Sequence, residues 1–403
     1  MGTSEPSIEV VATGLAAGGD ALARADDGRV VFVAGALPGE RVVARVVDTR
    51  RDFLRAETIE VLDASADRVA PRHSACGGCT WQHVAATAQP GLKVGIVVDA
   101  LRRIAGLVDV PVVARPGTFG RSLRTTVRLG VGADGRAGER RRGTHEVVPA
   151  SPGCAALHPA LAELVRESRF PASASEVVLR VGVASGERAA HVDAAGPAER
   201  SSLPSDVQVG PEAVVHEEVA GAWLQVSIRS FFQPGPVAAG ELVAAVDEAV
   251  GDALPAGGHL LDAYAGVGLF GATVGSRRSA GRVTAVEISR PAVADARVNL
   301  ARAGVDGRVV RSEVARWRPT ATPDPAIDVV VADPARTGLG RPGVAAVAAA
   351  GVDRLVLVSC DPASLARDTA LLAGSGFALR RVELVDAFPD TFHVEAVARF
   401  DRC

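Results

Sequence analysis

The sequence predicts a multi-domain α/β protein: a small N-terminal β-barrel, a central α+β region and a C-terminal Rossmann-like domain with a mostly parallel sheet. Short alternating strands fill the N-terminal part, mixed short strands with polar turns fill the middle, and apolar strands alternate with helical stretches after residue 236. We place the boundaries at 1–69, 70–230 and 231–403. A chain of 403 residues is long enough for several domains.

The composition is typical of a globular protein, with 48% apolar and 23% charged residues. No stretch reads as about 18 uninterrupted apolar residues, and the N-terminus lacks a basic region followed by an apolar run. We therefore expect a cytoplasmic protein with no membrane partner. Separately, we expect it to be a monomer. Because the formal net charge is −3, a nucleic acid would have to be held by a local basic surface.

The N-terminal barrel is predicted from alternating apolar residues over 7–69. Four such runs are separated by turn sequences such as ADDGR and ALPGE, and they cover 8–15, 28–35, 40–49 and 56–65. Strands of this length with turn signals between them are typical of small all-β barrels.

The central region begins with a glycine-rich stretch at 70–93, followed by a predicted helix at 94–106 and mixed strands over 110–226. Residues 115–145 contain eight arginines and two acidic residues, the strongest local positive charge in the chain. This segment, which includes Arg124, is either an RNA-binding surface or a solvated edge strand and hairpin.

The C-terminal domain is predicted from apolar runs that alternate with helices. The runs cover 259–266, 281–288, 326–334 and 353–361, and the helices cover 241–250, 290–304 and 362–376. Near-continuous apolar runs are typical of strands covered on both faces, so the pattern indicates βαβ units in an open parallel sheet.

A glycine-rich loop, residues 265–271, follows the first of these strands and matches G-x-G-x-x-G. Such a turn lets a ligand approach the backbone at a helix N-terminus. Glu287 ends the next strand and is placed to accept hydrogen bonds from both hydroxyls of a ribose. A methyl donor, a dinucleotide and a purely structural turn all fit the loop. Asp262, in the strand before it, favours the methyl donor.

Reactive side chains are predicted at one edge of the same sheet. Asp333 and Cys360 each follow an apolar strand, and Glu395 lies in a late strand, FHVEAVARF. Open α/β sheets bind ligands at the carboxyl ends of their strands. Cys360 precedes Asp-Pro at a helix start, where a helix N-terminus lowers a thiol pKa and favours the thiolate. The alternative is a buried cysteine that acts as a small apolar residue.

At this point the motifs resemble a known family. DAYAGVGLFG, DPARTGLG, VSCDPASLARD and HVEAVARF look like the RNA 5-methyluridine methyltransferases. The N-terminal barrel resembles a TRAM domain, an RNA-binding module, and LRTTVRL resembles the central RNA-binding region. The resemblance implies a class I methyltransferase fold and methyl transfer from S-adenosylmethionine to carbon 5 of a uridine, in ribosomal RNA rather than transfer RNA.

The resemblance also implies roles for single residues. Cys360 would be the nucleophile and Glu395 the proton acceptor, and Arg124 and Phe231 would bind RNA. The residues implied to bind S-adenosylmethionine are Gln233, Tyr264, Glu287 and Asp333. The sequence departs from the family pattern in three places. Asp361 stands where asparagine is usual, Ala335 replaces a second proline, and Leu269 stands where some members have asparagine.

Many TRAM-bearing members hold a 4Fe-4S cluster through four cysteines, and this chain matches three of those positions. They are Cys76, Cys79 and Cys154, whereas the first position reads Ala70-Pro71, so one expected ligand is absent. Three interpretations stay open: a cluster completed by His73 or an external ligand, a metal-free segment, and a zinc site with His73 or His83. An odd total of five cysteines argues against a disulfide framework.

Two other functions compete with methyl transfer. A nicotinamide oxidoreductase would use the glycine-rich loop, and binding of NAD without binding of S-adenosylmethionine would favour it. A non-catalytic RNA-binding protein would use the barrel and the arginine-rich segment, and would keep its function when Cys360 is replaced.

Overall fold

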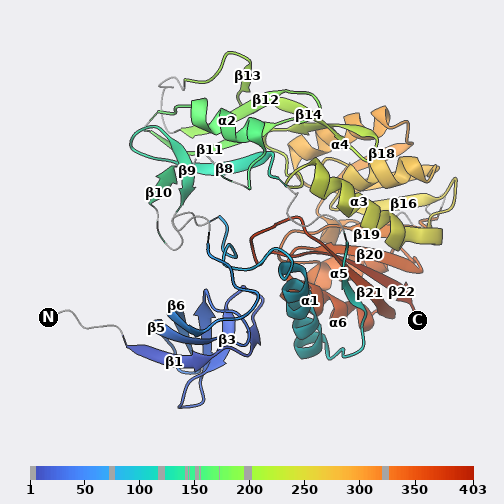
Figure 1. Ribbon diagram of the computed structural model, residues 1–403. Helices are drawn as coiled ribbons and strands as arrows, with labels where there is room; N and C mark the ends of the chain where they lie inside the picture. The colour runs from blue at the N-terminus through green and yellow to red at the C-terminus, as the bar shows by residue number, and fades with distance from the viewer. Residues whose placement is uncertain are drawn as a thin grey trace.

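The structure, a computed structural model, describes residues 6–71, 78–116, 123–140, 144, 146–149, 154, 156–171, 173–194, 202–319 and 326–403. Figure 1 shows an N-terminal sheet and a central sheet at opposite ends of the molecule, with the C-terminal domain alongside both. Within these residues, no helix combines the length and the apolar character that crossing a membrane requires.

The N-terminal part is a six-stranded sheet in the order β1-β5-β6-β4-β3-β2. Its strands are β1 (Ser7–Val11), β2 (Gly14–Leu15), β3 (Ala21–Arg24), β4 (Val30–Ala34), β5 (Arg41–Thr49) and β6 (Phe53–Asp63). All four runs predicted from the sequence contain strands, and β3 was missed. In the described part of the chain β1 and β2 are the edges, so hydrogen bonds do not close the expected barrel. The sheet encloses Val31, Val33 and Val42, which are fully buried.

The central part has a second six-stranded sheet, in the order β10-β9-β8-β11-β12-β13, and a hairpin of two further strands. The strands are β8 (Thr126–Val131), β9 (Ala137–Arg140), β10 (Val147–Pro149), β11 (Ala174–Val181), β12 (Arg188–Ala194), β13 (Val207–Val209), β14 (Val214–Val219) and β15 (Ala222–Ser227). Helix α2 (Pro159–Glu167) buries Leu161 and Leu164 against this sheet.

The C-terminal part is an eight-stranded sheet in the order β18-β17-β16-β19-β20-β22-β21-β7. Its strands are β7 (Val112–Ala114), β16 (His259–Ala263), β17 (Arg282–Glu287), β18 (Gly307–Arg311), β19 (Val329–Ala332), β20 (Arg354–Ser359), β21 (Phe377–Val385) and β22 (Glu395–Arg402). Its helices are α3 (Pro236–Val250), α4 (Arg290–Arg302), α5 (Gly340–Ala348) and α6 (Pro362–Ala373). The sheet is mixed, because β22 runs antiparallel to both β20 and β21.

The predicted apolar runs form the middle of this sheet. Every residue of β16 and β19 is buried, as expected for strands with helices on both faces. Strands β18 and β21 and helix α5 were not predicted from the sequence, because the periodicity of their apolar residues is weak.

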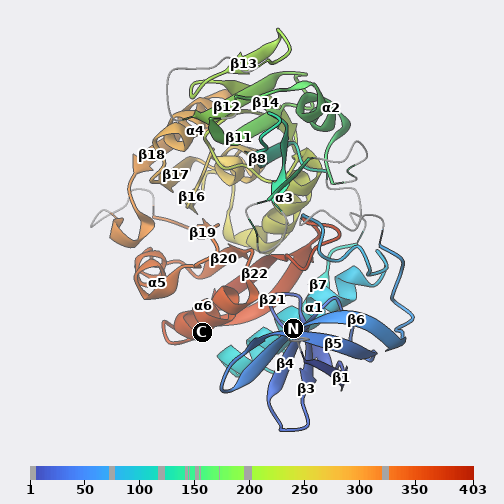
Figure 2. The same ribbon diagram turned by 90° about the vertical axis from the view of Figure 1, so that its left-hand side faces the viewer.

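Helix α1 (Gln89–Ala100) and the π-helical turn that follows it (Leu101–Ala105) correspond to the helix predicted at 94–106. Ile96 packs into the N-terminal sheet, whereas Val97 packs into the core beneath α6. Figure 2 shows α1 between these two parts. Strand β7 pairs with β21, so residues 112–114 of the predicted central domain belong to the C-terminal sheet.

The order of the strands brings their functional ends together. Strands β16, β17, β19 and β20 are parallel, so their carboxyl ends share one edge. Strand β22 runs the other way, and Ser359 at the end of β20 pairs with Ala396. This register places Glu395, the first residue of β22, at the same edge as Cys360.

Candidate active site

A cavity of about 570 Å³ lies at this edge of the C-terminal sheet. Its volume falls in the range of roughly 300–1,000 Å³ typical of small-molecule sites. We call it the edge pocket. All six residues implied to act in catalysis or cofactor binding line it: Gln233, Tyr264, Glu287, Asp333, Cys360 and Glu395. The geometry thus gathers groups that are up to 162 positions apart in the sequence (233 to 395).

The loop after β16 forms one wall of the pocket, and its backbone is left-handed at several positions. Tyr264 has φ +61°, an unusual value for a residue with a side chain, and Gly268 has φ +82°. A Cβ on Gly268 would lie 3.3 Å from Ala296 of α4, so this glycine also permits close packing of loop and helix. Strained backbone of this kind is often found at binding sites.

Asp262 does not line the pocket. It is fully buried beneath the loop, and its Oδ2 accepts a hydrogen bond from the Gly271 N–H at 2.9 Å. Burial raises the pKa of Asp262 to about 7, and this hydrogen bond opposes the rise. The sequence suggested that Asp262 marks a methyl-donor site, whereas the structure gives it the task of fixing the start of the turn after the loop.

Glu287 ends β17 and is held by backbone N–H groups. Its Oε2 accepts from Gly266 at 2.9 Å, and its Oε1 accepts from Ile288 and Ser289 at 2.8 and 2.7 Å. A carboxylate has about four acceptor positions, so roughly one stays open. Glu287 can therefore accept from one ribose hydroxyl as it stands. Accepting from both ribose hydroxyls, as the sequence predicted, requires Glu287 to lose its hydrogen bond from the Gly266 N–H.

Gln233 and Asp333 approach each other across the pocket. Gln233 is 5% exposed, and its Nε2 donates to Asp333 Oδ2 at 3.3 Å. Burial raises the pKa of Asp333 to about 7, while the bond from Gln233 opposes this rise. A carboxylate in such surroundings favours a cationic ligand.

Cys360 lies between β20 and α6, as predicted, but its environment differs from the prediction. Asp361 caps the helix by accepting from the Ser364 N–H at 2.7 Å. Burial raises the pKa of the Cys360 thiol to about 11, and the nearby acids Glu395 and Asp333 add to the rise. The predicted thiolate at the helix N-terminus is thus wrong for the protein without ligands, because burial and acidic neighbours outweigh the helix end.

Glu395 is 4% exposed and lies among the same acidic groups. Burial, followed by the charge of Asp333, holds its pKa well above the usual range, and the charge of Arg336 acts in the opposite direction. These surroundings therefore favour the protonated form of Glu395. Once ionised, it is a stronger base than an ordinary glutamate.

Three further pocket residues were not singled out from the sequence: Arg336, Phe388 and His393. Arg336 is exposed and forms no hydrogen bond or ion pair with the residues that the structure describes. Burial and then the positive charge of Arg336 lower the pKa of His393 to about 4, so this imidazole is neutral. Position next to a predicted site was the only available signal, since Arg336 lies in DPARTG and His393 precedes Val394-Glu395.

Helix α1 fixes the loop that carries Phe388 and His393. Lys93, the only lysine of the chain, is buried and donates to Asp386 Oδ1 at 2.6 Å and to the Phe388 carbonyl at 2.9 Å. Gln89 exchanges two further hydrogen bonds with Asp390. One wall of the edge pocket is therefore supported from the junction with the N-terminal domain.

The two residues implied to bind RNA lie at different distances from this chemistry. Phe231 lines the pocket and its side chain is 72% exposed, so an aromatic face is available to a base. Arg124 precedes β8 in the central domain, and its charge reaches His393 of the pocket. The rest of the arginine-rich segment lies partly outside the described residues, including 117–122 and 141–143.

The described part of the cysteine segment shows no metal site. Cys79 and Cys154 belong to the described residues, whereas Cys76 and His73 lie outside them. Across the described ranges, no group of three or more His, Cys, Asp or Glu side chains is arranged to hold a metal. Because Cys76 lies outside the described residues, the cluster expected from the sequence stays a prediction.

The edge pocket does fit S-adenosylmethionine. It joins a left-handed glycine loop, an acidic residue at the end of β17 and a half-buried carboxyl group, Asp333, in one cavity of suitable size. The glycine-rich loop by itself would also fit a nicotinamide dinucleotide.

Comparison with known proteins agrees with these features. A model for the TRAM domain matches residues 7–59, and a model for tRNA (Uracil-5-)-methyltransferase matches residues 222–402. An uncharacterized RNA methyltransferase of Streptomyces avermitilis is 36% identical over 95% of each chain. The 23S rRNA (uracil(1939)-C(5))-methyltransferase RlmD of Alkalilimnicola ehrlichii is 32% identical over 98% of this chain and 96% of its own.

Among solved structures, the Pyrococcus abyssi tRNA (uracil-54, C5)-methyltransferase in complex with S-adenosyl-L-homocysteine has a TM-score of 0.72. The two sequences are 24% identical, and the match covers 99% of this chain and 100% of the other. This likeness shows a shared fold. The two family models and the identities of 36% and 32% to relatives matched over nearly their whole length show the family. The chain belongs to the TRAM-domain-containing RNA 5-methyluridine methyltransferases, a family of S-adenosylmethionine-dependent enzymes.

Proposed function

We propose that this protein methylates carbon 5 of a uridine in RNA through a covalent adduct between Cys360 and carbon 6 of the base. The observation that carries the proposal is the edge pocket, where Cys360, Glu395 and Asp333 lie together beside an exposed aromatic residue, Phe231. A thiol, a buried carboxyl and an aromatic face suit an unstacked pyrimidine.

Gln233, Tyr264, Glu287 and Asp333 would hold the cofactor. When bound, S-adenosylmethionine supplies an electrophilic methyl group and one positive charge. A positive charge beside Cys360, Asp333 and Glu395 favours the ionised form of each, just as Arg336 favours it for Cys360 and Glu395. The raised pKa values in the edge pocket would fall when both ligands are bound.

Cys360 begins the reaction. Its thiol gives up its proton to solvent, the Sγ thiolate forms a bond with carbon 6 of the uracil, and the electron pair of the 5,6 double bond moves toward carbon 5 and the 4-carbonyl. Carbon 5 thereby becomes nucleophilic enough to take up the methyl group. Arg336 is free to stabilise the negative charge that develops on the base.

Glu395 ends the reaction. After methylation, carbon 5 carries both a proton and the new methyl group. An ionised Glu395 would remove that proton, the double bond would form again, and the bond between Sγ and carbon 6 would break. Burial at the start of β22 suits this step because it makes the carboxylate a stronger base.

An adduct assay tests the proposal. RNA containing 5-fluorouridine has no removable proton at carbon 5, so it should trap wild-type protein in a denaturation-resistant complex. Cys360→Ala should form none, whereas Cys403→Ala, which replaces an exposed cysteine outside the pocket, should form as much as wild type. An adduct formed by Cys360→Ala would rule out the role of Cys360, and the absence of an adduct with wild type would leave RNA binding without this chemistry as the better account.

We propose ribosomal RNA as the target. The support is that a relative that shares 32% identity over nearly the whole chain is a 23S rRNA enzyme. The structural neighbour named for transfer RNA is less similar in sequence, at 24% identity. Mapping 5-methyluridine in total RNA with and without the gene separates the two. A missing modification in transfer RNA alone would contradict the proposal.

Other expectations from the sequence stay predictions. These are the cytoplasmic location, the monomeric state and the iron–sulfur cluster. Purification without oxygen would test the cluster, because bound 4Fe-4S gives brown absorbance and stoichiometric iron. The mechanism above has no step that depends on it.

A further inference from the structure

The segment that carries Phe231 and Gln233 is fixed from both sides by groups outside the pocket. It follows the hairpin β14–β15 directly and begins with a tight turn at 227–230, in which the Ser230 N–H donates to the Ser227 carbonyl at 2.9 Å. The position of this turn therefore decides where Phe231 and Gln233 lie. Neither serine lines the edge pocket.

Asp295 of α4 holds the turn from the side of the catalytic domain. Its carboxylate is fully buried and accepts four hydrogen bonds. The donors are the Ser227 N–H at 2.9 Å, the Ser227 hydroxyl at 2.7 Å, the Ser230 hydroxyl at 2.6 Å and the Gln225 amide at 3.0 Å. All three donor residues belong to β15 or to the turn itself.

Arg180 of β11 holds the same turn from the side of the central domain. Its side chain is buried, and it donates to the carbonyls of Ser227 and Ser230 at 2.7 and 2.8 Å and to the Thr126 hydroxyl at 2.9 Å. Burial lowers the pKa of Arg180 to about 10 and Asp295 opposes this, so the guanidinium is charged at neutral pH. The turn thus lies between a buried cation and a buried anion.

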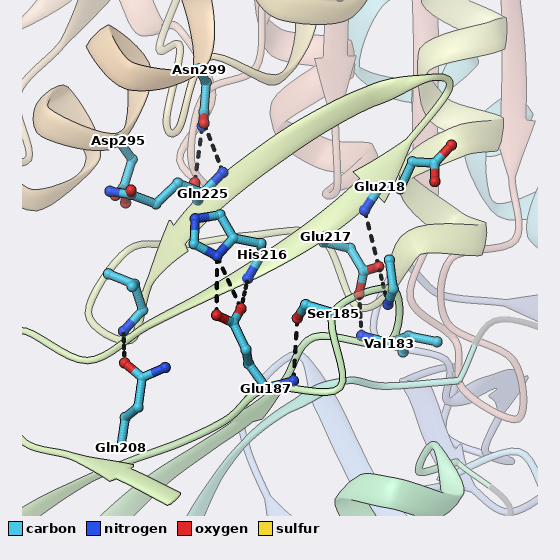
Figure 3. Close-up of polar contacts among 12 residues, drawn as sticks. Val183, Ser185, Glu187, Gln208, His216, Glu217, Glu218, Gln225, Asp295 and Asn299 are labelled. Carbon is cyan, nitrogen blue, oxygen red and sulfur yellow. Dashed lines mark hydrogen bonds and ion pairs between the residues drawn. The ribbon is translucent and has the colours of Figure 1, made fainter. Parts of the chain in front are cut away.

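The hairpin before the turn joins the same two domains (Figure 3). Glu217 of β14 accepts from the N–H groups of Val183 and Ala184, which follow β11. On β15, Gln225 bonds to Asn299 of α4, and Asn299 also donates to the Val267 carbonyl of the cofactor loop at 2.8 Å. The loop at 265–271 and the segment after the turn are therefore both positioned by hydrogen bonds to side chains of α4.

The far end of the segment is fixed too. The Thr125 N–H donates to the Pro234 carbonyl at 2.7 Å, and a Cβ on Gly235 would lie 2.3 Å from the Leu123 carbonyl oxygen. Both contacts come from the strand end that carries Arg124. Residues 231–234 are thereby held at each end by the central domain.

We propose that Arg180 and Asp295 are positioning residues that act as one clamp: they hold the turn at 227–230 so that Gln233 meets Asp333 and Phe231 faces the edge pocket. This inference rests on the proposed function, because it assumes that the pocket binds S-adenosylmethionine. It assigns the central domain a part in cofactor binding as well as in RNA binding.

Two variants test the clamp, Arg180→Met and Asp295→Ala, with Asp295→Asn as the conservative change. We expect the dissociation constant for S-adenosylhomocysteine, measured by calorimetry, and the KM for S-adenosylmethionine to rise about tenfold or more, since misplacement by about 1 Å is that costly. Asp295→Asn should fall between Asp295→Ala and wild type, because its amide oxygen still accepts.

Arg115→Met is the matched control. Arg115 is also a largely buried arginine with several partners, Glu241, Glu248 and Glu383, but none of them lines the edge pocket. A purely structural loss lowers the fraction of active protein and hence the apparent kcat, without changing KM. We expect that pattern for Arg115→Met alone. An unchanged KM and dissociation constant in folded Arg180→Met and Asp295→Ala would overturn the inference.

A milder variant keeps the test decisive if those proteins do not fold. Ser230→Ala removes one donor to Asp295 and should speed amide hydrogen exchange over residues 231–235 in the protein without ligand. Unchanged exchange in that peptide would also overturn the inference. If wild-type protein binds no S-adenosylhomocysteine, the proposed function fails instead, and that outcome is read from wild type alone.

Discussion

The pH dependence of Cys360 alkylation tests the electrostatics of the edge pocket directly. Burial and two acidic neighbours raise the thiol pKa from its ordinary value of 9.0 to about 11. Only the thiolate reacts with iodoacetamide. At pH 8 the thiolate fraction is about one in a thousand for a pKa near 11 and about one in ten for a pKa near 9, so the expected reduction is about hundredfold.

The assay is mass spectrometry of the peptide that contains Cys360, after timed alkylation of ligand-free protein at increasing pH. The rate should keep rising up to about pH 11. Glu395→Gln should increase the rate at fixed pH, because Glu395 raises this pKa, and Arg336→Gln should decrease it, because Arg336 lowers it. Arg115→Gln, remote from the pocket, should leave the rate unchanged. A rate that levels off at or below pH 9, or opposite effects of the two pocket variants, would refute the reasoning.

Three further predictions concern stability. Lys93→Met leaves Asp386 buried without its partner and should lower the free energy of unfolding, measured in urea, by about 3–5 kcal/mol. Adding Asp386→Leu should restore much of this loss. A double variant as unstable as Lys93→Met alone would contradict a buried ion pair. Gly19→Val should destabilise by more than about 1 kcal/mol, because Gly19 has φ +80° and its Cβ would lie 2.4 Å from Phe392, and Phe392→Ala should relieve only the steric part. Asp262 has a folded pKa of about 7 against an ordinary 3.8, so the folded state binds the proton more tightly. The contribution of Asp262 to the free energy of unfolding is complete below about pH 4 and is lost, by up to about 4 kcal/mol, as the pH rises to about 7. Thermal unfolding of Asp262→Asn at increasing pH should not show that loss.

Much of the C-terminal domain follows from local sequence. Strands β16, β17, β19 and β20 were predictable because each is a run of apolar residues covered on both faces. Strand β21 was not, since its exposed and buried residues do not alternate regularly. The pairing of β7 with β21 joins residues about 270 positions apart, and no local signal specifies such a contact.

The site was predictable where a motif carries the chemistry. Asp333, Cys360 and Glu395 line one pocket, as the order of strands predicted, and the other residues implied by the resemblance, Gln233, Tyr264 and Glu287, line it too. Arg336 and His393 were missed because nothing in their own sequence distinguishes them from surface arginine and core histidine. Lys93 was missed for the same reason, since its importance lies in Asp386, a partner far along the chain.

The sequence by itself determined which reactive groups exist and which strand end carries each, because strand period and loop chemistry are local properties. It could not determine the protonation of Cys360. The helix start that favours a thiolate is visible in the sequence, whereas the burial and the acidic neighbours that outweigh it arise only when β19, β20 and β22 meet at one edge. The clamp of Arg180 and Asp295 is likewise a tertiary fact, since each residue is an ordinary charge until folding buries both against one turn.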